Sequence, residues 1–259
     1  MAADWLAQRD PQLTFLLLAL FFAAATELGY RLMRGSEKTR EERAFVLATY
    51  LSVLGLLIGF TLTIAINDYS KRNSTIVAEA NAWGTAAFDI ELLPEPYRSE
   101  LLKKISAYVD LRLDGFPGEV GPAQNQRILA AQLSIWHQFN EALARKNDVA
   151  LSVALRGSVS EALNAAVNRE FSARVKIPKG VLDMVILTAT IACLLLGGRF
   201  STHTLRTRLL ACLLPLLLAA SIGLIIDIDT MQSGRVRAPA QPMLDLKQTV
   251  ETLLAQPRR

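Results

Sequence analysis

Four long apolar runs constrain the fold of this chain more than any other feature of its sequence. Their lengths approach the roughly 20 residues that a helix needs to cross the hydrocarbon core of a bilayer. Together they account for much of the 51% hydrophobic content of the 259 residues. We therefore predict an all-α, polytopic membrane protein with four transmembrane helices. The runs are residues 13–33, 44–66, 181–198 and 209–228.

The first run resembles a secretory signal because the small residues Ala23, Ala24 and Ala25 follow an apolar core. Asp4 and Asp10 lie before the run, whereas Arg31 lies near its end and Arg34 follows it. A signal peptide has the opposite arrangement, with basic residues before its apolar core. We therefore expect this run to stay in the protein as a membrane helix.

A long polar segment after the second run divides the chain into four predicted parts. Residues 1–67 form an N-terminal transmembrane helix pair, and residues 68–180 form a helical extramembrane insert. Residues 181–228 form a C-terminal transmembrane pair, and residues 229–259 form a tail with a short helix. An even number of crossings places the insert and both termini on one side. The Lys and Arg residues near the two sides almost balance, so the positive-inside rule does not decide the orientation.

The second apolar run passes into polar sequence without a glycine or proline after Gly59. Ile76, Ala80, Trp83 and Ala87 continue an apolar stripe at helical spacing beyond the predicted membrane segment. We therefore predict one rigid helix that leaves the membrane and packs inside the insert.

The insert shows helical periodicity and no strand-like alternation of apolar and polar residues. Three further helices are expected after the prolines at positions 94 and 96. Their predicted core faces are Leu101, Ile105, Tyr108 and Val109 on the first, Leu129, Leu133, Trp136, Asn140 and Leu143 on the second, and Leu155, Val159, Leu163 and Val167 on the third.

The side chains on one face of the second membrane helix change along its length. They are first apolar, then an amide, and then a cation. Phe60, Ile64, Asn67, Lys71 and Ser74 share this face. In a ring of subunits the face would form an apolar constriction that opens into a positively charged vestibule, which favours anions. The alternative is that Asn67 and Lys71 are interfacial residues without a role in conduction.

Two pairs of small residues occur at the spacing that permits close helix contacts in membranes. Gly55 and Gly59 form a Gly-x-x-x-Gly pair on the second run, and Ala219 and Gly223 form a similar pair on the fourth. We expect helix packing at both pairs. The contact is interpreted as intrachain packing, and a seam between subunits is the alternative.

Charged residues near the predicted membrane ends are interpreted as ion pairs. Glu27 is four residues before Arg31, and Asp183 is four residues after Lys179. A proton or ion relay at these positions is the alternative. Asp227 and Asp229 are too few for calcium, which takes 6 to 8 oxygen ligands. We expect them to pair instead with Arg235 or Arg237, which follow shortly after.

Catalytic, cofactor and metal signatures are missing from the sequence. The two cysteines, Cys193 and Cys212, fall within apolar runs and have no metal-ligand spacing. The two histidines, His137 and His203, lie outside any catalytic motif, and His137 is interpreted as a packing residue. We therefore expect no enzyme activity, no cofactor and no metal. The net charge is +4, but the sequence contains no motif that combines basic and aromatic residues. No nucleic-acid partner is therefore expected.

Three segments resemble the bacterial bestrophin-like membrane family. The resemblance covers residues 44–250. It is most specific from Asn67 and Tyr69 to Gly84 and Thr85, in the LPEPYR turn at residues 93–98, and from Asp227 and Asp229 to Gly234.

Bestrophins are pentameric anion channels with four membrane helices, a helical cytosolic part and a pore along the second helix. The resemblance therefore implies a homo-oligomer, a pentamer, that conducts a small anion across the lipid bilayer of the bacterial inner membrane. It also implies a cytoplasmic insert and cytoplasmic termini. The chain departs from that pattern because Phe60 has no matching aromatic triplet and only Asp227 and Asp229 represent the acidic cluster of calcium-regulated bestrophins. The alternative function is a non-conducting scaffold or sensor whose insert recruits a partner.

Overall fold

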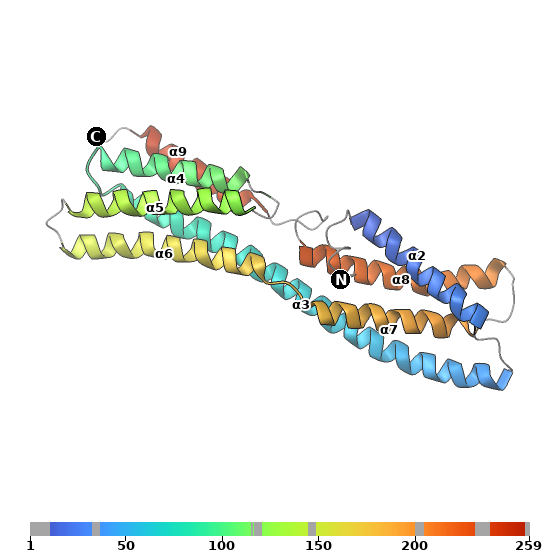
Figure 1. Ribbon diagram of the computed structural model, residues 1–259. Coiled ribbons are helices and arrows are strands. Elements are labelled where there is room, and N and C mark those ends of the chain that lie inside the picture. The colour runs from blue at the N-terminus through green and yellow to red at the C-terminus, as the bar shows by residue number, and fades with distance from the viewer. Residues whose placement is uncertain are drawn as a thin grey trace. The chain divides into compact units, whose positions relative to one another are not determined.

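The computed structural model describes residues 11–32, 37–114, 116, 121–144, 149–199, 205–230 and 239–256. These residues contain α-helices and no strand, which confirms the prediction of an all-α fold (Figure 1). The helices in chain order are α2 (Pro11–Leu32), α3 (Glu37–Ile90), α4 (Tyr97–Asp114), α5 (Pro122–Ala144), α6 (Val149–Arg174), α7 (Lys179–Gly197), α8 (Leu205–Thr230) and α9 (Gln241–Ala255).

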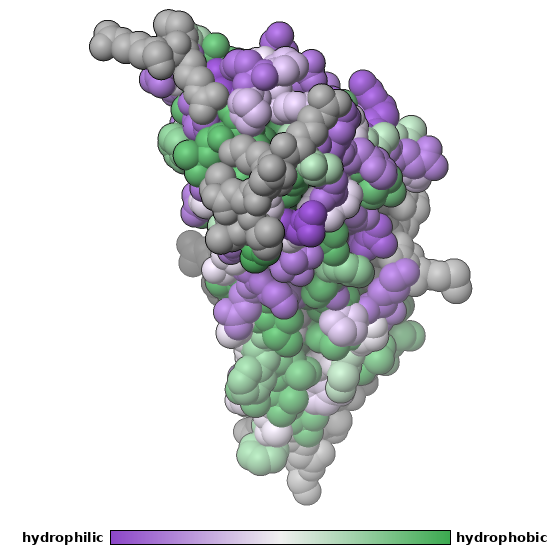
Figure 2. Space-filling view, turned by 90° about the vertical axis from the view of Figure 1, so that its left-hand side faces the viewer, coloured by the Kyte–Doolittle hydropathy of each residue, from purple (hydrophilic) through white to green (hydrophobic). Residues whose placement is uncertain are grey.

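Four helical stretches are long and apolar enough to cross a membrane, as the four apolar runs predict. The stretches are Gln12–Leu32, Ala44–Ile90, Ser152–Gly197 and Ala211–Thr230. On the face drawn in Figure 2, hydrophobic and hydrophilic residues gather in different regions of the surface. Such segregation is expected of a chain that is partly surrounded by lipid.

The chain folds into two compact units that alternate along the sequence. Unit 1 comprises Met1–Tyr69 and Lys176–Val236, and unit 2 comprises Ser70–Val175 and Arg237–Arg259. The helix α3 is continuous from Glu37 to Ile90 and contributes residues to both units. Its continuity confirms the prediction drawn from the unbroken stretch after Gly59.

In unit 1, α2 packs against α7 and α8. The backbones of α2 and α7 approach each other closely where Gly29 and Gly197 face the partner helix. A Cβ atom added to Gly29 would overlap the carbonyl group of Leu194, and one added to Gly197 would overlap the carbonyl group of Thr26. Glycine is therefore required at both positions, because the two backbones touch where a side chain would begin.

Unit 2 is a helical bundle built around the second half of α3. The residues of the predicted α3 stripe, Ile76, Ala80, Trp83 and Ala87, are all buried in one hydrophobic core. Within this bundle α4 packs against α5 and α9. The predicted core face of α4 is also confirmed, since Leu101, Ile105, Tyr108 and Val109 are fully buried.

The predicted core face of α5 is confirmed at Leu143 but wrong at Leu129 and Leu133. Leu129 and Leu133 are 55% and 49% exposed. The buried side of the helix instead consists of Ile128, Gln132, Ile135, Phe139, Ala142 and Leu143. The helix carries apolar residues on two neighbouring faces, so periodicity alone does not choose between them. Gln132 belongs on the buried side because its amide donates a hydrogen bond to the hydroxyl of Tyr108.

The C-terminal helix α9 is part of the unit 2 core. Its buried residues Met243, Leu246 and Val250 join the same hydrophobic cluster as α4. Arg98, in the LPEPYR turn, donates from Nη2 to the carbonyl oxygen of Leu253 at 2.7 Å. The sequence predicts a short helix in the tail, but it does not predict that this helix completes the bundle.

Candidate functional site

The predicted pore-lining residues lie on an exposed face of α3. Phe60 is 62% exposed and Ile64 is 43% exposed. Asn67 and Lys71 are exposed as well. The opposite side of the same helix is buried in the core of unit 1 through Leu47, Leu54, Thr61 and Ala65. One side of α3 therefore packs against its own chain, and the side from Phe60 to Lys71 remains open in the described part of the chain.

The membrane-type part of α3 is the least covered of the four apolar stretches. Only 17% of its most apolar window is buried, against 33 to 50% for the other three. Helices in a membrane protein meet lipid, protein or an aqueous path on each side. An amide and an ammonium group on the open side are unfavourable towards lipid tails, because polar groups in hydrocarbon lack partners.

The two small-residue pairs have different surroundings. Ala219 is fully buried, and a Cβ atom added to Gly223 would lie 4.0 Å from Phe15 of α2. By contrast, Cβ atoms added to Gly55 and Gly59 would meet nothing within 4 Å. The intrachain neighbour that our interpretation assigned to Gly55 and Gly59 is therefore not found in the described residues.

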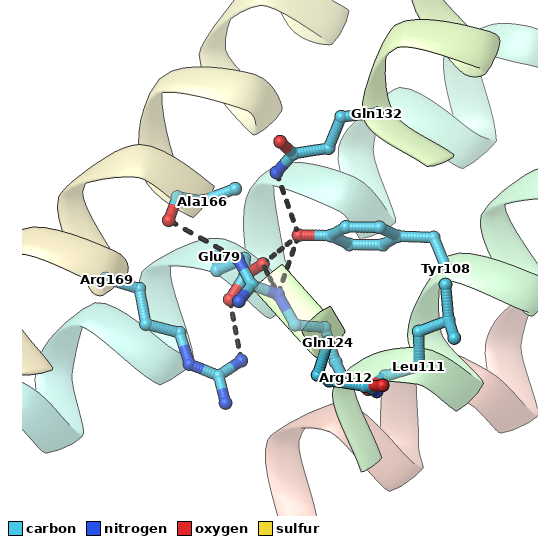
Figure 3. Close-up of polar contacts among 8 residues, drawn as sticks. All are labelled: Glu79, Tyr108, Leu111, Arg112, Gln124, Gln132, Ala166 and Arg169. Atoms are coloured by element: carbon cyan, nitrogen blue, oxygen red, sulfur yellow. Dashed lines mark hydrogen bonds and ion pairs between the residues drawn. The ribbon is translucent and has the colours of Figure 1, made fainter. Parts of the chain in front are cut away.

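A buried polar cluster in unit 2 holds the other half of α3 (Figure 3). The carboxylate of Glu79 is at its centre and has no exposed surface. Tyr108 and Arg112 reach it from α4, and Arg169 reaches it from α6, while Gln132 of α5 contacts the Tyr108 hydroxyl. Residues of four helices, α3, α4, α5 and α6, therefore meet in this cluster, and Glu79 itself joins α3 to α4 and α6.

Both oxygens of Glu79 accept hydrogen bonds. Arg112 Nε donates to Oε1 at 2.9 Å, and Arg169 Nη1 donates to Oε2 at 2.7 Å. The Tyr108 hydroxyl also donates to Oε1, and it accepts a bond from Arg112 Nε at 2.9 Å. Arg112 Nη2 adds a contact of 3.4 Å to the carbonyl oxygen of Ala166. Charge-assisted bonds of this kind are among the stronger hydrogen bonds in proteins.

The cluster combines one carboxylate with two guanidinium groups. Burial, together with the charge of Glu79, raises the pKa of Tyr108 above its usual value. The phenol therefore remains a neutral donor at physiological pH. Aromatic rings also cover the cations, since Arg112 Cζ lies 5.4 Å from the Tyr108 ring centroid and Arg169 Cζ lies 5.2 Å from that of Phe116. We assign the cluster the role of fixing α3 within unit 2.

Glu79 is not among the functional residues predicted from the sequence. A signal for it was present, because Glu79 lies three residues after Ile76 and four before Trp83, on the apolar stripe of the helix. A carboxylate on a buried stripe needs cationic partners. The sequence does not show which of the many arginines supply them.

The predicted charged pairs have mixed outcomes. Glu27 and Arg31 form the expected ion pair, with 3.0 Å between Oε1 and Nε. Asp229 accepts a hydrogen bond from the backbone N–H of Ile177 at 3.0 Å, a partner that the sequence does not suggest. Arg235 and Arg237, the predicted partners of Asp227 and Asp229, lie outside the described residues.

The described residues contain no group of three or more His, Cys, Asp or Glu side chains that could hold a metal ion. Cys193 is buried and Cys212 is exposed, each within an apolar helix. His137 lies on the exposed side of α5, so its interpretation as a packing residue is wrong. His203 lies outside the described residues.

Four apolar helices, with one of them presenting a partly polar open face, define a polytopic helical membrane protein. The model of the bestrophin-like domain matches residues 14–243 of the chain. This protein therefore belongs to the bestrophin-like family, as the resemblance of its motifs predicts.

Solved structures show the same fold at low sequence identity. A bacterial bestrophin homolog from Klebsiella pneumoniae is 11% identical, with 95% of this chain and 99% of that chain covered and a TM-score of 0.69. A mutated form of a Klebsiella pneumoniae homolog is 11% identical, with coverages of 93% and 97% and a TM-score of 0.71. A crystal structure of a membrane protein is 12% identical, with coverages of 95% and 99% and a TM-score of 0.70. No functionally curated protein matches the chain.

Proposed function

We propose that this protein is the subunit of an oligomeric anion channel. The observation that carries the proposal is the exposed face of α3, on which Phe60 and Ile64 are followed by Asn67 and Lys71. Around a central axis, such faces form an apolar constriction next to a ring of amides and a ring of positive charges. Membership of the bestrophin-like family, a family of anion channels, supports the proposal.

The oligomer that we propose is a pentamer in the bacterial inner membrane. Gly55 and Gly59 mark a seam between neighbouring subunits, because their open surroundings permit the backbone of another helix to approach closely. The lipid bilayer and a small anion are the other partners. The four-part division at residues 67, 180 and 228 describes the topology of the subunit, with the insert and both termini in the cytoplasm.

Subunit number is the first measurement that tests the proposal. Native mass spectrometry of the protein in mild detergent is expected to show a pentamer. A monomer or dimer would remove the central pore. The alternative function, a non-conducting scaffold or sensor, would then be favoured, and a partner retained by the insert in a pull-down without ion flux would support it.

The charge of Lys71 provides the residue-level test of conduction. Lys71→Glu is expected to lower the permeability of anions relative to cations in a reconstituted bilayer, because it replaces a ring of positive charges by negative ones. Reversal potentials in a salt gradient measure the change.

Lys103→Glu is the matched control for the Lys71 variant. Lys103 is an exposed lysine on α4 and undergoes the same change of charge away from the proposed pore face. Equal selectivity of the Lys71 and Lys103 variants would contradict the assignment of Lys71 to the ion path.

A further inference from the structure

The exposed hydroxyl groups on the open side of α3 are already used as donors within the helix. Thr49, Ser52 and Thr63 donate to backbone oxygens four residues earlier, at 3.1, 3.0 and 2.9 Å respectively. A hydroxyl group has a single proton to donate. These side chains therefore present oxygen lone pairs outwards, and lone pairs repel an anion.

Ser74, at the far end of the same face, has the same limitation. Its hydroxyl donates to the carbonyl oxygen of Lys71 at 2.8 Å. The remaining polar side chains of the face are Asn67 and Lys71, which are exposed and donate to no other group among the described residues. Asn67 follows Phe60 by two helical turns and precedes Lys71 by about one turn, so all three share the face.

The two donors differ in what they offer an anion. The Lys71 ammonium is a strongly hydrated point charge on a flexible stem, so it attracts anions from a distance without fixing their coordination. The Asn67 side chain is short and carries two N–H donors on a planar amide. Groups that replace the hydration shell of an ion are those that distinguish one ion from another.

We infer that the side-chain amide of Asn67 determines which anions pass, by replacing water around a small, strongly hydrated halide such as chloride. Lys71 concentrates anions near this position, and Asn67 coordinates them. The inference rests on the proposed channel function and assigns the chemistry of selection to one residue. Chloride gains more than iodide from such donors, because the smaller ion approaches the N–H groups more closely and has a larger dehydration cost to be compensated.

Bi-ionic reversal potentials with chloride on one side of a planar bilayer and iodide on the other test the inference. Asn67→Leu keeps a similar side-chain size and removes both donors. It is expected to shift the chloride-to-iodide permeability ratio towards iodide by on the order of tenfold. Asn67→Gln retains the amide and is expected to keep the ratio much closer to that of the unsubstituted protein.

Two further variants separate donor loss from general disturbance of the helix. Asn67→Ser is expected to resemble Asn67→Leu, because a serine hydroxyl at this position can donate to its own helix as Ser52 and Thr63 do. Thr63→Val removes an exposed hydroxyl group, and valine has nearly the same shape as threonine. This variant is expected to leave the chloride-to-iodide permeability ratio unchanged. Subunit number measured by native mass spectrometry shows that each variant still assembles.

The outcomes distinguish this inference from the proposed function. Absence of anion current in the unsubstituted protein would overturn both. Anion current with the same chloride-to-iodide ratio in the unsubstituted, Asn67→Leu and Asn67→Ser proteins would overturn the role of Asn67 alone. A change caused by Thr63→Val and not by the Asn67 variants would place selection at a different turn of α3.

Discussion

At the residue scale, Glu79 is the only carboxylate among the side chains drawn in the cluster of Figure 3, and it joins α3 to α4 and α6. Its two oxygens accept bonds from Tyr108 and from two arginines, and no part of it reaches solvent. A buried ion pair adds little stability compared with apolar packing, but removing one partner leaves a charge uncompensated. Substitution of Glu79 should therefore lower the stability of unit 2 strongly.

Glu79→Gln keeps the shape of the side chain and removes its charge. We expect the free energy of unfolding to fall by about 3–5 kcal/mol, because Arg112 and Arg169 lose their shared carboxylate. Denaturant unfolding in detergent, followed by tryptophan fluorescence, measures the change, since Trp83 lies 5.0 Å from the Tyr108 ring centroid.

Glu161→Gln serves as the control, because Glu161 is an exposed glutamate on α6. It is expected to change stability by less than about 0.5 kcal/mol. Similarly small effects of both substitutions would mean that other groups compensate the positive charges of Arg112 and Arg169. Glu79 would then not be the residue that organises the bundle.

At the scale of elements, the glycines of α2 and α7 lie at a contact within the chain, whereas Gly55 and Gly59 of α3 lie at the seam that we propose between chains. Gly29→Ala is expected to lower stability by about 1–3 kcal/mol, because the new Cβ atom meets the backbone of α7. A Cβ atom added to Gly59 meets nothing within 4 Å in the described residues, so Gly59→Leu introduces a bulky side chain on an open side of α3. It is expected to leave the subunit folded and to reduce the number of subunits in the oligomer.

Thermal unfolding and native mass spectrometry measure these two effects on the same samples. Gly180→Ala is a suitable control, since a Cβ atom at this position in α7 also meets nothing within 4 Å. An unchanged subunit number in Gly59→Leu would exclude the proposed seam, and a fully stable Gly29→Ala would show that α2 and α7 can separate without cost.

The elements also show where sequence reasoning succeeds and where it stops. The continuation of α3 beyond the membrane segment was predictable, because its apolar stripe continues through Ile76 and Trp83 without a helix breaker. The buried face of α5 was not, because Leu129 and Ile128 begin equally plausible apolar faces. Periodicity identifies a helix, but the partner surface decides which side is buried. The open face around Phe60 was predicted as a pattern, and its role in conduction remains a proposal.

At the scale of the whole molecule, the family match and the fold comparisons extend over nearly the entire chain. The orientation in the membrane is a separate question. The Lys and Arg residues on the two sides of the predicted membrane helices are nearly equal in number, so the positive-inside rule does not decide it. Our proposal places the insert in the cytoplasm. It therefore places the residues that follow the third apolar run, beginning near Arg199, on the opposite side.

Single-cysteine labelling tests this orientation. Lys103→Cys and Arg199→Cys are introduced separately into a chain in which Cys193 and Cys212 are replaced by alanine. A membrane-impermeant maleimide is expected to label position 199 in intact spheroplasts and position 103 only after permeabilisation. The reverse pattern would invert the orientation, and labelling of both positions from one side would contradict the proposed four-crossing topology.

The docking of α9 has a consequence for the order in which the protein is made. Unit 2 consists of residues 70–175 and of a segment that begins at residue 237, and the second half of unit 1 is synthesised between them. At about 5–20 residues per second, the ribosome needs roughly 4–14 s to proceed from Val175 to Leu246. During this interval the side of α4 that contacts α9 is uncovered, and Arg98 lacks its partner at Leu253. Completion of the unit 2 core therefore follows the synthesis of both remaining apolar helices, and newly made chains pass through a stage at which chaperones can recognise the open bundle.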